Sequence, residues 1–102
     1  VLDAGGGNGV EALELAGAGY SVTLVDVSAA MLDEARQAAA ERGLSAQLQI
    51  VQSDLGALPQ LLPAASFDLV LCHNVLQYVT DVSQLLDALT AVLAPGGLLS
   101  LV

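Results

Sequence analysis

The chain has a single cysteine and no lysine, and each shortage excludes a class of protein. One cysteine in 102 residues cannot form an internal disulfide framework, which fits the reducing conditions of the cytoplasm. Arg36 and Arg42 are the only basic side chains against eleven acidic ones, and the net charge is −9. Because such a surface repels phosphate groups, we do not expect these residues by themselves to grip nucleic acid.

Long apolar runs and metal-ligand clusters are also missing. No run approaches the roughly eighteen apolar residues that a membrane span requires, so no membrane partner is expected. One cysteine and one histidine offer no metal site, and no serine nucleophile motif is present. With 55% apolar and 13% charged residues, the chain is mostly interior. It starts and ends in strand-like sequence, so we expect residues 1–102 to be one domain core, a fragment of a larger domain.

Short apolar segments alternate with helical patterns along the whole chain. Ser28 predicts a helix start, Gly43 a helix end, and Asp81 the start of a helix with buried Val82, Leu85, Leu86, Leu89, Val92 and Leu93. Pro59 and Pro63 predict an irregular connection or short helix, and Pro95-Gly96-Gly97 predicts a turn. The expected strands are 1–3, 20–26, 48–51, 66–73 and 98–102, the first and last of them truncated.

This alternation indicates an α/β fold, a Rossmann-like doubly wound sheet with five parallel strands. In such sheets, ligands bind beyond the carboxyl ends of the strands. The glycines at 5–9, Asp26, Asp54 and His73 each follow a predicted strand. The residues that follow these four strands are therefore predicted to line one ligand-binding site.

The segment Asp3-Ala4-Gly5-Gly6-Gly7-Asn8-Gly9 predicts a nucleotide site between a strand and a helix, because glycine lets the backbone approach a ligand closely. A dinucleotide fingerprint counted from Gly5 needs glycine at position 10, which is Val10, and a pyrophosphate favours basic groups that this loop lacks. Asp3 instead suits a ligand carrying an ammonium and a sulfonium. Asp26 can accept hydrogen bonds from both ribose hydroxyls. These features favour S-adenosylmethionine.

The chain resembles the class I S-adenosylmethionine-dependent methyltransferases over essentially all its residues. The resemblance lies in the glycine segment with its preceding Asp3, in Asp26 with Ser28 and Met31, and in Ser53-Asp54-Leu55, Phe67-Asp68-Leu69-Val70 and Leu93-x-Pro95-Gly96-Gly97. It implies that the glycine loop wraps the methionine and ribose, that Asp26 holds the ribose, and that Asp54 and Leu55 contact adenine. The predicted cofactor site is Asp3, Gly5, Gly6, Gly7, Asp26, Val27, Asp54, Leu55 and His73.

A narrower resemblance is to the tRNA carboxymethoxyuridine methyltransferases, which esterify a carboxylate on a modified wobble uridine. It rests on the glycine segment, on Asp26-x-Ser28-Ala29-x-Met31 and on His73-x-Val75-Leu76-Gln77-Tyr78-Val79. In that subfamily the residue matching His73 touches the cofactor. Gln77-Tyr78 departs from the Glu-Trp often found there, and Asp54 stands where some members have a small residue.

Several alternatives stay open on the sequence alone. Asp26 and Asp54 also fit helix caps, and His73 fits a satisfied polar group as well as a ligand contact. Tyr78 fits either an acceptor pocket or a cover for the sheet. The predicted partner is a methyl acceptor, either tRNA or a small molecule of the quinone-precursor type. A nicotinamide-dependent oxidoreductase module and a non-catalytic relative are the rival functions, and no catalytic base is identified.

Overall fold

A computed structural model describes all residues from Val1 to Val102. Five strands form one parallel sheet in the order β3-β2-β1-β4-β5. The predicted fold is confirmed. The strands are β1 (Leu2–Ala4), β2 (Val22–Asp26), β3 (Leu48–Gln52), β4 (Phe67–Cys72) and β5 (Leu93–Leu101).

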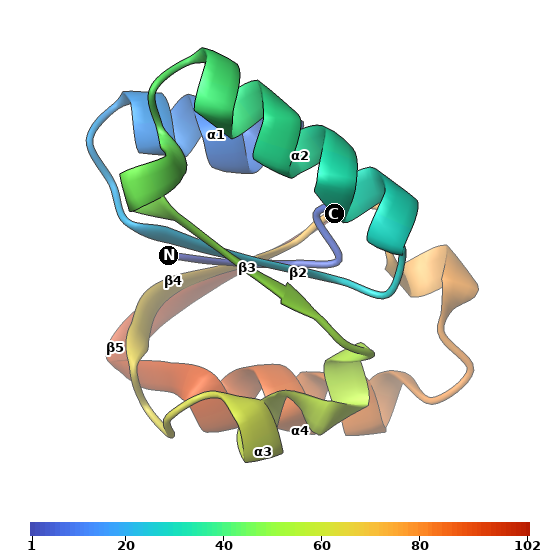
Figure 1. The fold of residues 1–102 in the computed structure, drawn as a ribbon. Coiled ribbons are helices and arrows are strands. Elements are labelled where there is room, and N and C mark those ends of the chain that lie inside the picture. Colours follow the sequence, from blue (N-terminus) through green and yellow to red (C-terminus); the bar gives the residue numbers. More distant parts are fainter.

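Helices cover both faces of the sheet, as Figure 1 shows. On one face lie α1 (Val10–Gly17) and α2 (Ala29–Glu41), and on the other lie α3 (Leu58–Leu61) and α4 (Val82–Val92). Three short 3-10 turns complete the structure: η1 (Ser45–Gln47), η2 (Leu55–Ala57) and η3 (Leu76–Tyr78). None of these helices has the length and apolar character to cross a membrane.

Local capping explains where the two long helices begin. The Ser28 hydroxyl accepts a hydrogen bond of 3.2 Å from the Met31 amide, which starts α2. The Asp81 carboxylate accepts one of 2.9 Å from the Gln84 amide, which starts α4. Gly43 follows the end of α2 with φ +69°, a conformation that glycine adopts without strain. The predicted caps and helix end are confirmed.

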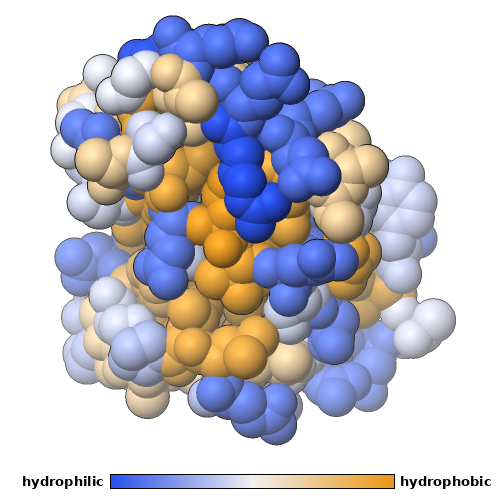
Figure 2. Space-filling model, in the orientation of Figure 1, coloured by the Kyte–Doolittle hydropathy of each residue, from blue (hydrophilic) through white to orange (hydrophobic).

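The core consists of two apolar clusters, one on each face of the sheet. Leu32, Ala35 and Ala39 of α2 pack with α1 on one face, and Leu85 and Leu89 of α4 pack on the other. In Figure 2 apolar residues gather in the middle of the view, between the two helical layers, and hydrophilic residues lie along the top and upper right. Burial of this apolar surface is the main term that stabilises the domain.

Three sequence-based expectations on α4 and β5 are wrong. Val82 is 43% exposed, because it is the first residue of α4 and burial begins one turn later at Leu85. Leu93 is not helical but starts β5. The Pro95-Gly96-Gly97 turn is a bulge inside β5: the register shifts from Phe67 opposite Leu93 to Leu69 opposite Leu98.

Candidate functional site

A cavity of about 620 Å³ opens at the carboxyl ends of the strands. Segments that follow four of them contribute to its lining: Gly5 and Gly7 after β1, Val27 after β2, Asp54 after β3 and Val75 after β4. Strand β1 lies between β2 and β4, where the connections leave for opposite faces of the sheet, and this switch point is where ligands bind in such folds. The four predicted strand ends therefore meet at one cavity, with His73 outside its lining.

The glycine loop needs residues without side chains, for two different reasons. Gly5 and Gly7 line the cavity with positive φ angles of +75° and +59°. Gly6 faces the protein instead, and a Cβ there would collide with the carboxylate of Asp3 and with Leu24. At Gly5 and Gly7 the loop therefore exposes its main chain to the cavity. At Gly6 the loop packs directly against Asp3 of β1.

Asp26 ends β2 and its carboxylate is fixed by two backbone amides. Its Oδ2 accepts a hydrogen bond of 2.9 Å from the Gly7 amide, and its Oδ1 accepts one of 2.9 Å from the Ser28 amide. A carboxylate oxygen has two lone pairs, so each oxygen keeps one for a further donor. Asp26 both holds the glycine loop and lines the cavity with spare acceptor capacity.

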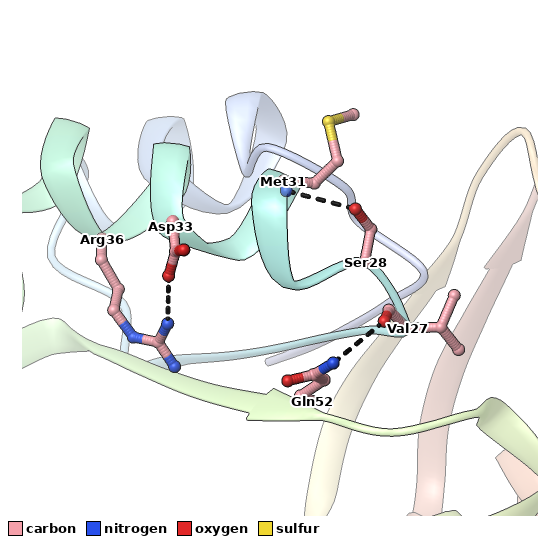
Figure 3. Close-up of polar contacts among 6 residues, drawn as sticks. All are labelled: Val27, Ser28, Met31, Asp33, Arg36 and Gln52. Carbon is pink, nitrogen blue, oxygen red and sulfur yellow. Dashed lines mark hydrogen bonds and ion pairs between the residues drawn. The ribbon is translucent and has the colours of Figure 1, made fainter.

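Val27 and Met31 provide apolar lining next to Asp26. Figure 3 shows that the Val27 carbonyl accepts a hydrogen bond of 3.2 Å from the Gln52 side chain, which fixes the backbone here. Val27 remains 63% exposed and Met31 40% exposed. Both residues line the cavity, so their exposed apolar surface is available to a bound ring.

Asp54 is a helix cap and a cavity residue at the same time. Its Oδ1 accepts a hydrogen bond of 3.2 Å from the Ala57 amide at the start of η2. That bond leaves Oδ2 without a protein partner. The two roles that the sequence left open for Asp54 are therefore compatible, and Leu55 lines the cavity beside it.

Asp3 is 2% exposed, and its Oδ2 is buried with no hydrogen-bond partner. Burial raises the pKa of this carboxyl from 3.8 to about 6; repulsion by Glu11 and Asp26 adds to the rise, and His73 opposes it. The residue lies under Gly6 rather than in the cavity lining. The negative charge of Asp3 under the loop attracts a cation in the neighbouring cavity, and an ammonium group is one.

His73 follows β4 but does not line the cavity. Its Nδ1 lies 2.8 and 3.0 Å from the two carboxylate oxygens of Glu11, and its Nε2 lies 2.8 Å from the Ser100 hydroxyl. Both ring nitrogens are thus engaged by protein groups. Its direct contact with a cofactor stays a prediction.

Sequence reasoning missed part of the cavity wall that follows β4. Val75, Thr80 and Gln84 line it, and so does Asp81, which the sequence indicated only as a cap. Tyr78 also lines it and is 81% exposed, so Tyr78 does not cover the sheet. No local pattern marks Thr80 and Gln84 as lining residues, because only the placement of the chain after β4 brings them to the cavity.

The acidic lining of the cavity favours a cationic ligand over one that carries a pyrophosphate. Asp26, Asp54 and Asp81 line it, and neither arginine does. A site with this lining attracts a cation and repels a pyrophosphate. The structure brings together no group of three His, Cys, Asp or Glu side chains that could hold a metal ion.

A family described as "Methyltransferase domain" matches residues 2–101. The chain belongs to this methyltransferase-domain family. The predicted recognition of a methyltransferase core is confirmed. An S-adenosylmethionine-dependent methyltransferase from Mesorhizobium loti has the same fold, with a TM-score of 0.85 and 34% identity, covering 98% of this chain and 43% of that one.

Two curated relatives differ in the methyl acceptor that their names give. The tRNA 5-carboxymethoxyuridine methyltransferase of Escherichia coli K12 is 44% identical over 101 residues, covering 99% of this chain and 38% of the relative. The ubiquinone biosynthesis O-methyltransferase of Colwellia psychrerythraea is 31% identical over 99 residues, covering 97% and 39%. This methyltransferase domain therefore spans less than half the length of either relative.

Proposed function

We propose that residues 1–102 bind S-adenosylmethionine and transfer its methyl group, with Asp26 holding both ribose hydroxyls. The observation that carries this proposal is the Asp26 carboxylate itself. Two backbone amides fix it at the cavity, and one lone pair on each oxygen stays free. Two adjacent hydroxyls of a ribose match two adjacent acceptors on one carboxylate.

Other residues of the same cavity are placed to contact the remaining parts of the cofactor. Asp54 accepts from the adenine amino group, while Val27 and Leu55 supply apolar contacts to the ring. The main chain at Gly5 and Gly7 would hold the ribose and the methionine moiety. The Asp3 carboxylate attracts the ammonium group through the loop.

Bound S-adenosylmethionine supplies a methyl group on sulfonium, already activated for in-line displacement by a nucleophile. The residues of this chain therefore act mainly by alignment and by exclusion of water. The glycine main chain and the Asp26 carboxylate fix the donor in the cavity. Val75 and Tyr78, in the segment after β4, also line the cavity, and we infer that the acceptor binds beside them. No general base is assigned, and an acceptor that is itself a carboxylate needs none.

For the acceptor we propose the carboxylate of a modified wobble uridine in tRNA. The 44% identity to a tRNA 5-carboxymethoxyuridine methyltransferase supports this choice. A net charge of −9 repels tRNA, so a basic surface outside residues 1–102 must hold the RNA. A tRNA acceptor also places the enzyme in the cytoplasm. A quinone precursor is the second candidate, supported by the similarity to a ubiquinone biosynthesis O-methyltransferase.

The acceptor is tested by mass spectrometry of tRNA nucleosides from a strain lacking the gene. A wobble-uridine methyl ester that disappears in the deletion strain, and returns with the wild-type gene, supports the tRNA proposal. Unchanged nucleosides together with accumulation of an unmethylated quinone precursor favour the second candidate.

The donor is tested separately from the acceptor. We expect S-adenosylhomocysteine to raise the melting temperature of the full-length protein, and NADH to leave it unchanged. The opposite pattern would indicate an oxidoreductase module. Binding of the donor without transfer to any tested acceptor would indicate a non-catalytic relative.

A further inference from the structure

The His73 ring joins three elements that are distant in the sequence. Glu11 belongs to the first turn of α1, His73 follows β4 directly, and Ser100 belongs to β5. In the neutral tautomer with its proton on Nδ1, the ring donates to Glu11 at 2.8 Å and accepts from the Ser100 hydroxyl at 2.8 Å. Each polar atom of the ring then has one partner. The His73 side chain is 18% exposed, so this ring is held rather than free in solvent.

The first turn of α1 has no capping side chain of its own. Gly9 occupies the cap position with φ +81°, and it has no side chain to accept from the helix amides. The glycine loop is bonded on the β2 side, where the Gly5 amide donates to the Val25 carbonyl at 2.7 Å and the Gly7 amide donates to Asp26. The bonds of Glu11 to His73 are the only side-chain hydrogen bonds from α1 to another element.

We propose that His73 is a positioning residue, which holds the glycine loop against β4 and β5 through Glu11 and thereby sets the affinity for the cofactor. This proposal rests on the proposed function. In this role His73 acts through Glu11 and α1, separately from the predicted contact of its ring with the cofactor. Ser100 orients the ring so that Nδ1 faces Glu11.

The pair is half-exposed, since the Glu11 side chain is 46% exposed. Ion pairs at such positions contribute little to the stability of a whole domain. Ligand affinity, unlike domain stability, depends on the position of the glycine loop. A small displacement of the amides at Gly5 and Gly7 moves groups that contact the ligand. We therefore expect loss of the pair to change cofactor affinity more than melting temperature.

The test is a double-mutant cycle in the full-length protein, read by calorimetric titration with S-adenosylhomocysteine. We expect Glu11→Ala and His73→Ala each to raise Kd about threefold to tenfold, and the double variant to resemble either single one. Glu11→Gln, which keeps an acceptor for the ring, should stay within about twofold of wild type. Glu14→Ala, on the same helix with no side-chain partner, is the matched control and should leave Kd unchanged.

Three results would overturn the proposal. If His73→Ala weakens binding and Glu11→Ala does not, the ring contacts the cofactor directly. If both variants lower the melting temperature and leave Kd unchanged, the pair is only structural. If the two effects on Kd add, the residues act independently.

Hydrogen exchange separates this proposal from the proposed function. The amides of Gly5, Gly7 and Gly9 should exchange faster in both single variants without any ligand, and at wild-type rates in Glu14→Ala. Should wild type fail to bind S-adenosylhomocysteine, the proposed function falls, and the exchange rates still test the positioning role. Unchanged exchange at these amides would contradict it.

Discussion

The Gly7 amide donates a hydrogen bond of 2.9 Å to the Asp26 carboxylate, so the loop after β1 is held by the residue that ends β2. The same carboxylate accepts from the Ser28 amide and still lines the cavity. One side chain therefore shapes the glycine loop and offers acceptors to a ligand. Its replacement should affect binding through both routes.

We expect Asp26→Asn to raise the Kd for S-adenosylmethionine roughly tenfold to a hundredfold, because charge-assisted hydrogen bonds worth about 1.5–3 kcal/mol are lost. Titration calorimetry on the full-length protein measures this. Asp33→Asn is the matched control, since Asp33 lies on exposed α2 surface paired with Arg36. An unchanged Kd in Asp26→Asn would reject the ribose assignment.

Gly6→Ala should strongly disturb the loop. A Cβ at this position would overlap the Asp3 carboxylate and Leu24, both buried, so β1 or the loop must move. We expect a loss of about 1–3 kcal/mol in stability, typical of overpacking, together with loss of cofactor binding. Gly17→Ala is the control, because its Cβ would meet only Leu44 at 3.9 Å. Equal behaviour of the two variants in chemical denaturation would contradict this account.

The Asp3 carboxyl predicts a pH dependence of stability. Its pKa is raised to about 6, so the folded state binds the proton more tightly than the unfolded state, where the value is near 3.8. The resulting stabilisation is present below about pH 4 and is lost as the pH rises through 6. The full effect is roughly 3 kcal/mol, at 1.36 kcal/mol per pKa unit.

The measurement compares wild type with Asp3→Asn, without ligand, by denaturant titration from pH 4 to pH 8. Relative to the variant, wild type should lose about 2–3 kcal/mol over this range. Asp87→Asn, an exposed replacement on α4, should show no such trend. A difference between wild type and Asp3→Asn that is constant with pH would show that Asp3 does not titrate there.

Asp54 separates capping from ligand binding. Asparagine caps a helix as well as aspartate does, so Asp54→Asn should keep stability within about 0.5 kcal/mol. Loss of the charge near the adenine amino group should raise the Kd for S-adenosylhomocysteine about threefold to tenfold. Asp54→Ala should lose both the helix cap and the charge near the adenine amino group. Loss of the cap should lower the free energy of unfolding by about 1 kcal/mol. If Asp54→Asn binds like wild type, the carboxylate is only a cap.

Local features of the sequence predicted most of the fold. Ser28 and Asp81 bond to amides three residues away, so their sequence context is enough to identify them as caps. The glycines and Asp26 were predictable because strand ends in a parallel sheet meet at one edge. The bulge at Pro95-Gly96-Gly97 was not, because it depends on the register of β5 against β4.

Contacts between residues that are far apart in the sequence could not be predicted from it. Glu11 carries no local sign of a partner, and His73 lies 62 residues away from it. Exposure of Tyr78 at the cavity likewise depends on how the chain leaves β4. His73 and Tyr78 were open questions in the sequence, and the packing of α1 and η3 decides where these side chains lie.

Titration of the full-length wild-type protein and of Asp26→Asn with S-adenosylhomocysteine tests the central claim most directly. We expect one site per chain in wild type and an affinity at least tenfold lower in the variant. Absence of binding to wild type, with binding of NADH in its place, would contradict it.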